Sequence, residues 1–192
     1  MRTRTKMLLI AAALLIIAGL WTWRFVTLKA YYHGLAGDQG EDKEYAMGDI
    51  VPMEYAGHPS GYSIRVDSFE LAEYEDIDPD IFAETYAARN GIEGKIALLH
   101  ITLSNIESEG VFGLESLRLR GDDTVITVES VLLKGLNPSL NGQTDVSLSK
   151  GDSTSFVVPL LIYKAQIPAA WNRLDRYSLY MIVTTNSDIR LQ

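Results

Sequence analysis

Residues 95–105 read KIALLHITLSN, and this stretch decides the fold class. Apolar side chains recur at every second position, namely Ala97, Leu99, Ile101 and Leu103. The intervening positions are Leu98, His100, Thr102 and Ser104, and all of them except Leu98 are polar. Alternation with a period of two predicts a β-strand with one face on a core and the other toward solvent.

On either side of this strand, four more stretches of the sequence predict strands: 61–71, 113–133, 148–163 and 177–185. Residues 61–71 alternate, but the apolar parity breaks after Val66, which predicts a β-bulge near Asp67–Ser68. Residues 113–133 predict two strands about a turn at 121–123. Residues 150–152 predict a turn before the next strand, and Pro159 within it predicts an edge position or a bulge, because proline donates no ladder hydrogen bond.

A short helical insertion is expected at residues 79–89. Asp78 is a suitable N-cap, Pro79 suits the first helical position, and Asn90-Gly91 is a stop signal. A second short helix or irregular segment is expected within residues 165–176. About seven to nine short strands with frequent turn signals predict an all-β, antiparallel β-sandwich, because a parallel architecture would need regularly alternating helices.

Two strand patterns carry a family resemblance. The strand KIALLHITLSN, ending at Asn105, and the later glycine turn and strand LSKGDSTSFVVPLLI, residues 148–162, together resemble bacterial extracytoplasmic domains of unknown function. This group is similar to a secreted mycobacterial antigen and has an immunoglobulin-like sandwich. The resemblance covers roughly Ala46 to Leu191. It implies an immunoglobulin-like fold outside the cytoplasm and supplies no catalytic residues.

An apolar run from Met7 to Trp23 precedes the strands. It lacks a small-x-small cleavage site, and its tryptophans suit a membrane interface, so a retained transmembrane signal-anchor is expected at residues 7–28. More basic residues precede the run than follow it, which predicts a cytoplasmic tail at 1–6 and an exported body. A glycine-rich, acidic tether is expected at 29–45, followed by the immunoglobulin-like domain at 46–192.

Charge and cysteine content exclude several functions. Five of the 17 basic residues lie in the first 29 positions and all 25 acidic residues lie beyond them, so the remainder carries a formal net charge of −13. Such a body disfavours nucleic acid, whose binding depends on cationic side chains. The chain has no cysteine, which excludes disulfides, thiolate metal sites and a cysteine nucleophile.

An acidic loop at residues 73–84 holds the only metal candidates. Asp76, Asp78 and Asp80 match the spacing of the first three oxygen donors of an EF-hand loop. The glycine and glutamate that such a loop needs are replaced by Ile81 and Ala87, so only a looser calcium site remains as a hypothesis. The alternative is a solvated loop in which Asp78 caps a helix.

Trp171 is the candidate interaction residue, because it lies outside the regular strands. Exposed, it would indicate a contact site; buried, it would close one end of the sandwich. No catalytic residue and no cofactor is predicted. The expected function is a non-catalytic binding module at the cell envelope, with a membrane contact through residues 7–28 and a protein or envelope component as partner. The alternatives are an accessory subunit of a transporter or sensor, and a calcium-dependent envelope enzyme using the acidic loop.

Overall fold

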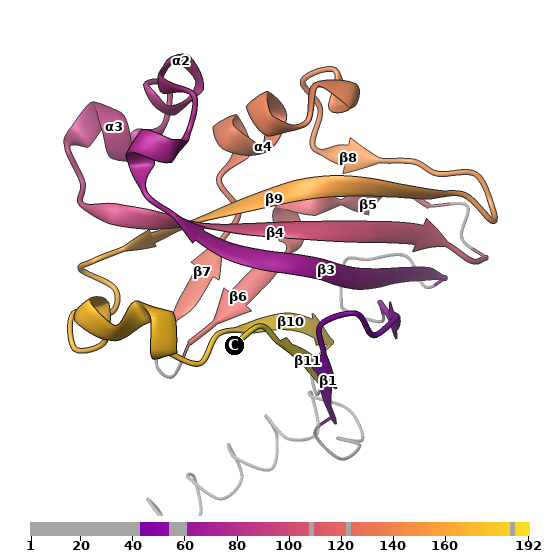
Figure 1. Ribbon diagram of the computed structural model, residues 1–192. Coiled ribbons are helices and arrows are strands. Elements are labelled where there is room, and N and C mark those ends of the chain that lie inside the picture. The colour runs from indigo at the N-terminus through magenta and orange to yellow at the C-terminus, as the bar shows by residue number, and fades with distance from the viewer. Residues whose placement is uncertain (1–42, 54–60, 108–109, 122–123, 185–186) are drawn as a thin grey trace, which may run out of the picture. The chain divides into compact units, whose positions relative to one another are not determined.

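The computed structural model describes residues 43–53, 61–107, 110–121, 124–184 and 187–192 (Figure 1). Within these ranges no helix is both long enough and apolar enough to cross a bilayer. The predicted tail at 1–6, the anchor at 7–28 and nearly all of the tether lie outside them. The described residues belong to one compact unit, 42–192. Its first strand begins at Lys43, inside the predicted tether.

The described strands form three sheets. A four-stranded sheet has the order β2 (Val51–Pro52), β3 (Tyr62–Ala72), β4 (Gly94–Asn105), β9 (Ser153–Tyr163). A five-stranded sheet has the order β1 (Lys43–Ala46), β11 (Ser187–Arg190), β10 (Tyr180–Thr184), β6 (Arg118–Arg120), β7 (Val125–Thr127). A small sheet pairs β5 (Phe112–Gly113) with β8 (Asp145–Val146). All pairs are antiparallel except β1 with β11.

Helical segments interrupt the strands. Between β3 and β4 come η1 (Tyr74–Asp76), α2 (Pro79–Phe82) and α3 (Tyr86–Asn90). Between β7 and β8 come α4 (Ser130–Leu136) and η3 (Pro138–Leu140). The turn η2 (Leu114–Ser116) precedes β6, and η4 (Trp171–Arg176) joins β9 to β10.

The two larger sheets share one core. Buried side chains of the four-stranded sheet, such as Leu99 and Ile101, belong to the same apolar cluster as Leu119, Met181 and Ile189 of the five-stranded sheet. Figure 1 shows these sheets as two layers, with β6, β10 and β11 on one side of β3, β4 and β9. The described residues are therefore mainly β, in several sheets, which is consistent with the predicted all-β sandwich.

Several local predictions are confirmed. The pairing of β3 with β4 shifts register between Val66 and Ser68, which is the predicted bulge. A turn lies before β9, closed by a 3.0 Å hydrogen bond from the Asp152 amide to the Ser149 carbonyl. Pro159 lies in β9, the edge strand of its sheet.

Other local predictions are wrong. Residues 130–133 were expected in a strand, but they begin α4, because the Glu129 carboxylate caps the helix by accepting from the Leu132 amide at 2.7 Å. The single helix expected at 79–89 is two helices, because Thr85 caps the second one by accepting from the Ala88 amide. The strand β11 (Ser187–Arg190) was not predicted.

The outer face of the four-stranded sheet is divided into two halves. In the covered half, Ile96 and Leu98 pack in a second apolar cluster with Leu132 of α4 and Ala87 of α3. Figure 1 shows α2, α3 and α4 together on the side of the sheet that faces away from β6 and β10. The other part, the open half, carries polar side chains without a helical cover. The functional candidates lie on and beside these two halves.

Candidate functional site

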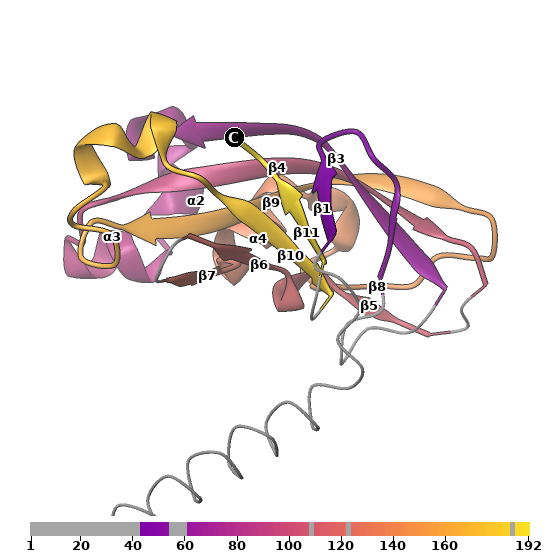
Figure 2. The same cartoon turned by 90° about the horizontal axis from the view of Figure 1, so that it is seen from below.

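A cleft of about 630 Å³ opens beside the covered half, and we call it the end cleft. Its lining comes from η1 (residues 73–75), Phe82 of α2, Ala87 and Ala88 of α3, the connection into β4 (residues 91–95) and Trp171 of η4. These segments meet because antiparallel pairing brings the end of β3, the start of β4 and the end of β9 to the same end of the four-stranded sheet. Figures 1 and 2 show η4, the yellow helical turns before β10, at this same end of the sandwich.

Aromatic side chains form much of the lining. The rings of Tyr74 and Phe82 lie 4.4 Å apart, centroid to centroid, at an interplanar angle of 35°. Both rings are half-buried and pack against the second apolar cluster. Their positions are therefore fixed from below by the core, while part of each side chain faces the cleft.

Tyr74 carries an unusual hydroxyl group. It is buried and has no hydrogen-bond partner among the described residues. Burial, followed by repulsion from Tyr163, raises the pKa of Tyr74 to about 12, since the phenolate cannot be solvated there. The phenol therefore stays neutral at physiological pH. Gly94 makes this position possible, because a Cβ at residue 94 would lie 2.2 Å from the Tyr74 oxygen.

Charged side chains stand at the rim of the end cleft. Lys95 forms an ion pair with Glu73. Glu93 forms another with Lys164, with 2.9 Å between the lysine Nζ and the Glu93 Oε1. Glu75, also at the rim, has no ion-pair partner within the described ranges. The lining therefore contains three carboxylates and one ammonium group, with one carboxylate uncompensated.

The structure places Trp171 between its two predicted roles. It is half-buried, packs against the main core of the sandwich and also lines the end cleft. Its indole is thus both a packing element and a surface that a ligand can reach. This arrangement suits recognition, because a ring held on one side by the core loses little conformational freedom on binding.

The three aspartates of the acidic loop do not converge. Asp76 accepts a hydrogen bond from the Glu73 amide at 2.9 Å, and Asp78 caps α2 by accepting from the Asp80 amide at 2.9 Å. Throughout the described ranges, no group of three or more acidic or histidine side chains is arranged to hold a metal ion. Capping therefore explains Asp76 and Asp78, and their binding of calcium stays a prediction.

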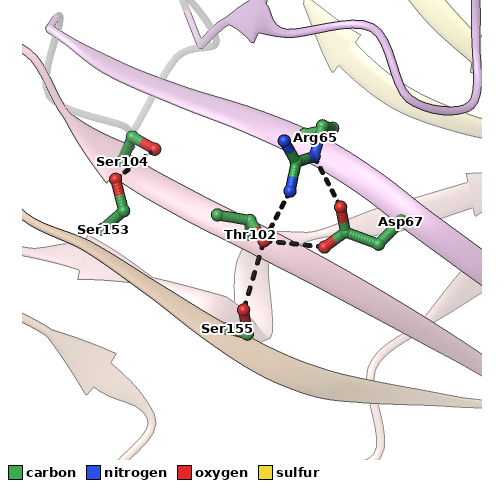
Figure 3. A network of polar contacts seen from close by, with 6 residues as sticks. All are labelled: Arg65, Asp67, Thr102, Ser104, Ser153 and Ser155. Atoms are coloured by element: carbon green, nitrogen blue, oxygen red, sulfur yellow. Dashed lines mark hydrogen bonds and ion pairs between the residues drawn. The ribbon is translucent and has the colours of Figure 1, made fainter.

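The open half carries a polar patch that we define by Arg65, Asp67, Thr102, Ser104, Ser153 and Ser155. Figure 3 shows these side chains turned toward one another across β3, β4 and β9. The Thr102 hydroxyl donates to Asp67 at 2.7 Å, and Asp67 also accepts from the Arg65 Nε at 2.5 Å. Ser153 donates to Ser104 at 2.8 Å. Each of these side chains thus has at least one hydrogen-bond partner within the patch.

Asp67 is the titratable centre of this patch. Partial burial alone would raise its pKa, but hydrogen bonds from Thr102 and Arg65, with the positive charge of Arg65, outweigh that effect. The pKa of Asp67 therefore lies below its ordinary value of 3.8. The carboxylate stays ionised at neutral pH and holds the patch together.

A second cleft, of about 610 Å³, includes Arg173 and Arg176 of η4 and Thr124. Thr124 adjoins residues 122–123, which lie outside the described ranges. The surroundings of these arginines are therefore only partly described, and the end cleft is the better-founded candidate.

The sequence pointed to one member of the end cleft, Trp171, and to the acidic loop at 73–84 only for its aspartates, none of which lines the cleft. It missed Tyr74, Phe82 and Glu75. The available signal was the insertion of aromatic residues into the acidic run at residues 70–84, which polar capping alone does not require. Asn137 was also missed. It is buried beside the covered half, where its amide hydrogen-bonds the backbone of Val157.

Comparison with known proteins gives a family and two structural likenesses. A family model described as Domain of unknown function (DUF5028) matches residues 42–186. The yjhA protein from Bacillus subtilis shares 12% identity at a TM-score of 0.41, covering 77% of this chain and 99% of that one.

A functionally unknown protein from Listeria monocytogenes EGD-e shares 10% identity at a TM-score of 0.40, covering 69% of this chain and 76% of that one. These comparisons give no support for the expected immunoglobulin-like family or for its similarity to a secreted mycobacterial antigen. No curated protein matches the chain.

Proposed function

Because the chain belongs to the family described as a domain of unknown function (DUF5028), we propose its function from its own geometry. It is a membrane-anchored, extracytoplasmic β-sandwich that acts without catalysis, as a binding module at the cell envelope. The end cleft is its binding surface. The observation that carries this proposal is the half-buried Trp171, which the core holds in place at the wall of that cleft.

The size and support of the end cleft favour binding. Its volume of about 630 Å³ falls within the range of roughly 300–1,000 Å³ that is usual for small-molecule sites. Tyr74 and Phe82 pack against the second apolar cluster and Trp171 packs against the main core, so a ligand meets a surface that is already formed. The polar patch lacks both properties, because it is a sheet surface whose polar groups are already paired.

The proposed sandwich is immunoglobulin-like, and its connectivity supports this assignment. The chain passes from β3 and β4 to β6 and β7, returns to β9, and ends with β10 and β11. The sheet orders β3-β4-β9 and β11-β10-β6-β7 correspond to A-B-E and G-F-C-C′ of a variable-type immunoglobulin domain. In this chain α4 and η3 follow C′, and α2 and α3 lie between A and B.

Topology can be tested by single cysteines, because the natural chain has none. We expect Ser153→Cys, at an exposed position, to react with a membrane-impermeant maleimide on intact cells. Thr5→Cys, in the predicted cytoplasmic tail, should react only after permeabilisation. The opposite pattern, or labelling of both sites without permeabilisation, would contradict the proposed anchoring.

Binding can be tested by site-specific photo-cross-linking of the full chain in its own membranes. A benzophenone amino acid at Ala88, which lines the end cleft, should give an adduct of defined mass. The same group at Ser104 in the polar patch is the matched control and should give none. Equal adducts at both positions, or no adduct from residue 88, would contradict a binding role for the end cleft.

The control chain for that experiment lacks residues 1–29, and so lacks the predicted anchor. Loss of the residue 88 adduct in this chain would be expected for a partner that is reached only at the membrane. A calcium-dependent rise in the melting temperature of the full chain would instead favour the ion-dependent hypothesis at Asp76, Asp78 and Asp80.

A further inference from the structure

We propose that the end cleft binds an organic cation, an alkylated or quaternary ammonium group, against its aromatic walls. This inference rests on the proposed function, since it names the ligand class of the same cleft. Two properties carry it: the negative charge around the cleft and the aromatic side chains within it.

Negative charge is concentrated at this end of the molecule. Residues 70–95 contain eight acidic and two basic side chains, a formal net charge of −6. Some of that charge is compensated at the cleft itself, because Glu73 pairs with Lys95 and Glu93 pairs with Lys164. Glu75, which also lines the cleft, has no ion-pair partner within the described ranges. A cleft with low-dielectric walls in such a field concentrates cations and repels anions.

The aromatic lining selects among cations. Tyr74, Phe82 and Trp171 all line the cleft, and the faces of aromatic rings attract cations through their quadrupole. A small metal ion is strongly hydrated and prefers several converging oxygen ligands, and the described residues hold no such group of acids. An alkylated ammonium group is weakly hydrated, so it can leave water for an aromatic surface with one carboxylate nearby.

The Tyr74 hydroxyl takes no part in this recognition. The hydroxyl group is buried and lies against the backbone of Gly94, and the raised pKa of Tyr74 keeps it neutral. Tyr74 is one of the residues that line the cleft, but its buried hydroxyl is not exposed to a ligand there.

The test uses Trp171 as the reporter. The full chain has three tryptophans, so replacing Trp21 and Trp23 by phenylalanine leaves Trp171 as the sole indole. The protein is kept in a polyoxyethylene detergent, because detergents with a choline headgroup would compete. Choline is the probe, and 3,3-dimethylbutan-1-ol is the control ligand of the same shape without charge.

We expect a saturable change in Trp171 emission with choline, and an affinity for the neutral alcohol at least about tenfold weaker. Glu75→Gln should weaken choline binding about threefold or more and reduce its dependence on salt. Glu115→Gln, at an exposed glutamate on η2, is the matched control and should bind as the natural chain does. Trp171→Leu, followed by calorimetry, should not bind choline.

The results separate the two proposals. Equal affinity for choline and the neutral alcohol would overturn the cation assignment and favour a neutral ligand, such as a sugar ring, that stacks on Trp171. No binding of choline, with the residue 88 adduct still formed, would overturn the ligand class alone. Loss of both signals in folded protein would overturn the proposed function as well.

Discussion

On the strand β4, Ile96 and Leu98 are almost fully buried under the helical insertions, whereas Thr102 and Ser104 remain partly exposed a few residues further on. All four side chains point to the same outer face of the four-stranded sheet. The covered half therefore contributes apolar burial to stability, and the open half contributes surface polar contacts, which are individually weak. The difference shows that the helices turn one half of a solvent face into a second core, and the end cleft opens at the border of that core.

The largest expected effect comes from Leu132→Ala in the covered half. Leu132 is fully buried, so the truncation removes apolar contacts and leaves a cavity under α4. We expect the free energy of unfolding to fall by about 2–5 kcal/mol, measured by urea denaturation. Val125→Ala, at an exposed side chain of β7, is the control and should change stability by less than about 0.5 kcal/mol. Similar losses for both variants would contradict a stabilising role for the apolar packing of the covered half.

The next effect is expected at Asn137, which links α4 and η3 to the edge strand β9. Its side-chain amide donates to the carbonyls of Leu133 and Val157, and its oxygen accepts from the Val157 amide at 2.9 Å. Asn137→Ala leaves buried backbone groups unpaired and should cost about 1–3 kcal/mol. The exposed Asn172→Ala is the matched control. An unchanged melting temperature for Asn137→Ala would mean that water replaces the amide without cost.

Tyr74→Phe is expected to have the opposite sign. It removes a buried hydroxyl that has no hydrogen-bond partner among the described residues, so stability at pH 7 should stay equal or rise by up to about 1 kcal/mol. The pKa of Tyr74 is raised from 10.0 to about 12. Between those pH values the phenol ionises in the unfolded chain before it ionises in the folded one, so the free energy of unfolding of the natural chain falls as the pH rises. The variant should therefore resist alkaline unfolding better than the natural chain. A lower stability would indicate an unrecognised partner for the hydroxyl.

The smallest effect is expected from Asp67→Asn in the open half, below about 1 kcal/mol at pH 7. The folded-state pKa of Asp67 is lowered, so its contribution is present above the unfolded value near 3.9 and is lost as the pH falls through the folded value. The stability difference between the natural chain and the variant should therefore shrink as the pH is lowered from about 5 to about 2. A pH-independent difference would contradict this assignment.

Much of the sandwich could be predicted because its strands have a local signal. The alternation at residues 95–105, the parity break at Asp67–Ser68 and the edge position of Pro159 all follow from backbone geometry. The helix α4 was mistaken for a strand because Val131, Leu132 and Leu133 form a short apolar run, whose periodicity does not separate a helix from a buried strand. The Glu129 carboxylate favours the helix, because it caps the N-terminus of α4 by accepting from the Leu132 amide.

The end cleft was less predictable. Trp171 stands outside the strands, but Phe82 and Tyr74, which also line the cleft, lie 89 and 97 residues earlier in the chain. Their meeting depends on the antiparallel register of β3, β4 and β9, which no local pattern specifies. Asn137 escaped prediction for the same reason, because its partner Val157 becomes adjacent only in the folded sheet.

The most direct test of the central claim, that the end cleft and not the polar patch is the binding surface, is NMR chemical-shift mapping. Choline is titrated into the isotope-labelled full chain, and backbone amides and the Trp171 indole are followed. We expect saturable shifts at Trp171 and at residues 91–93, with Thr102 and Ser155 unchanged. Shifts confined to Thr102 and Ser155, or no saturable shift at any described residue, would contradict it.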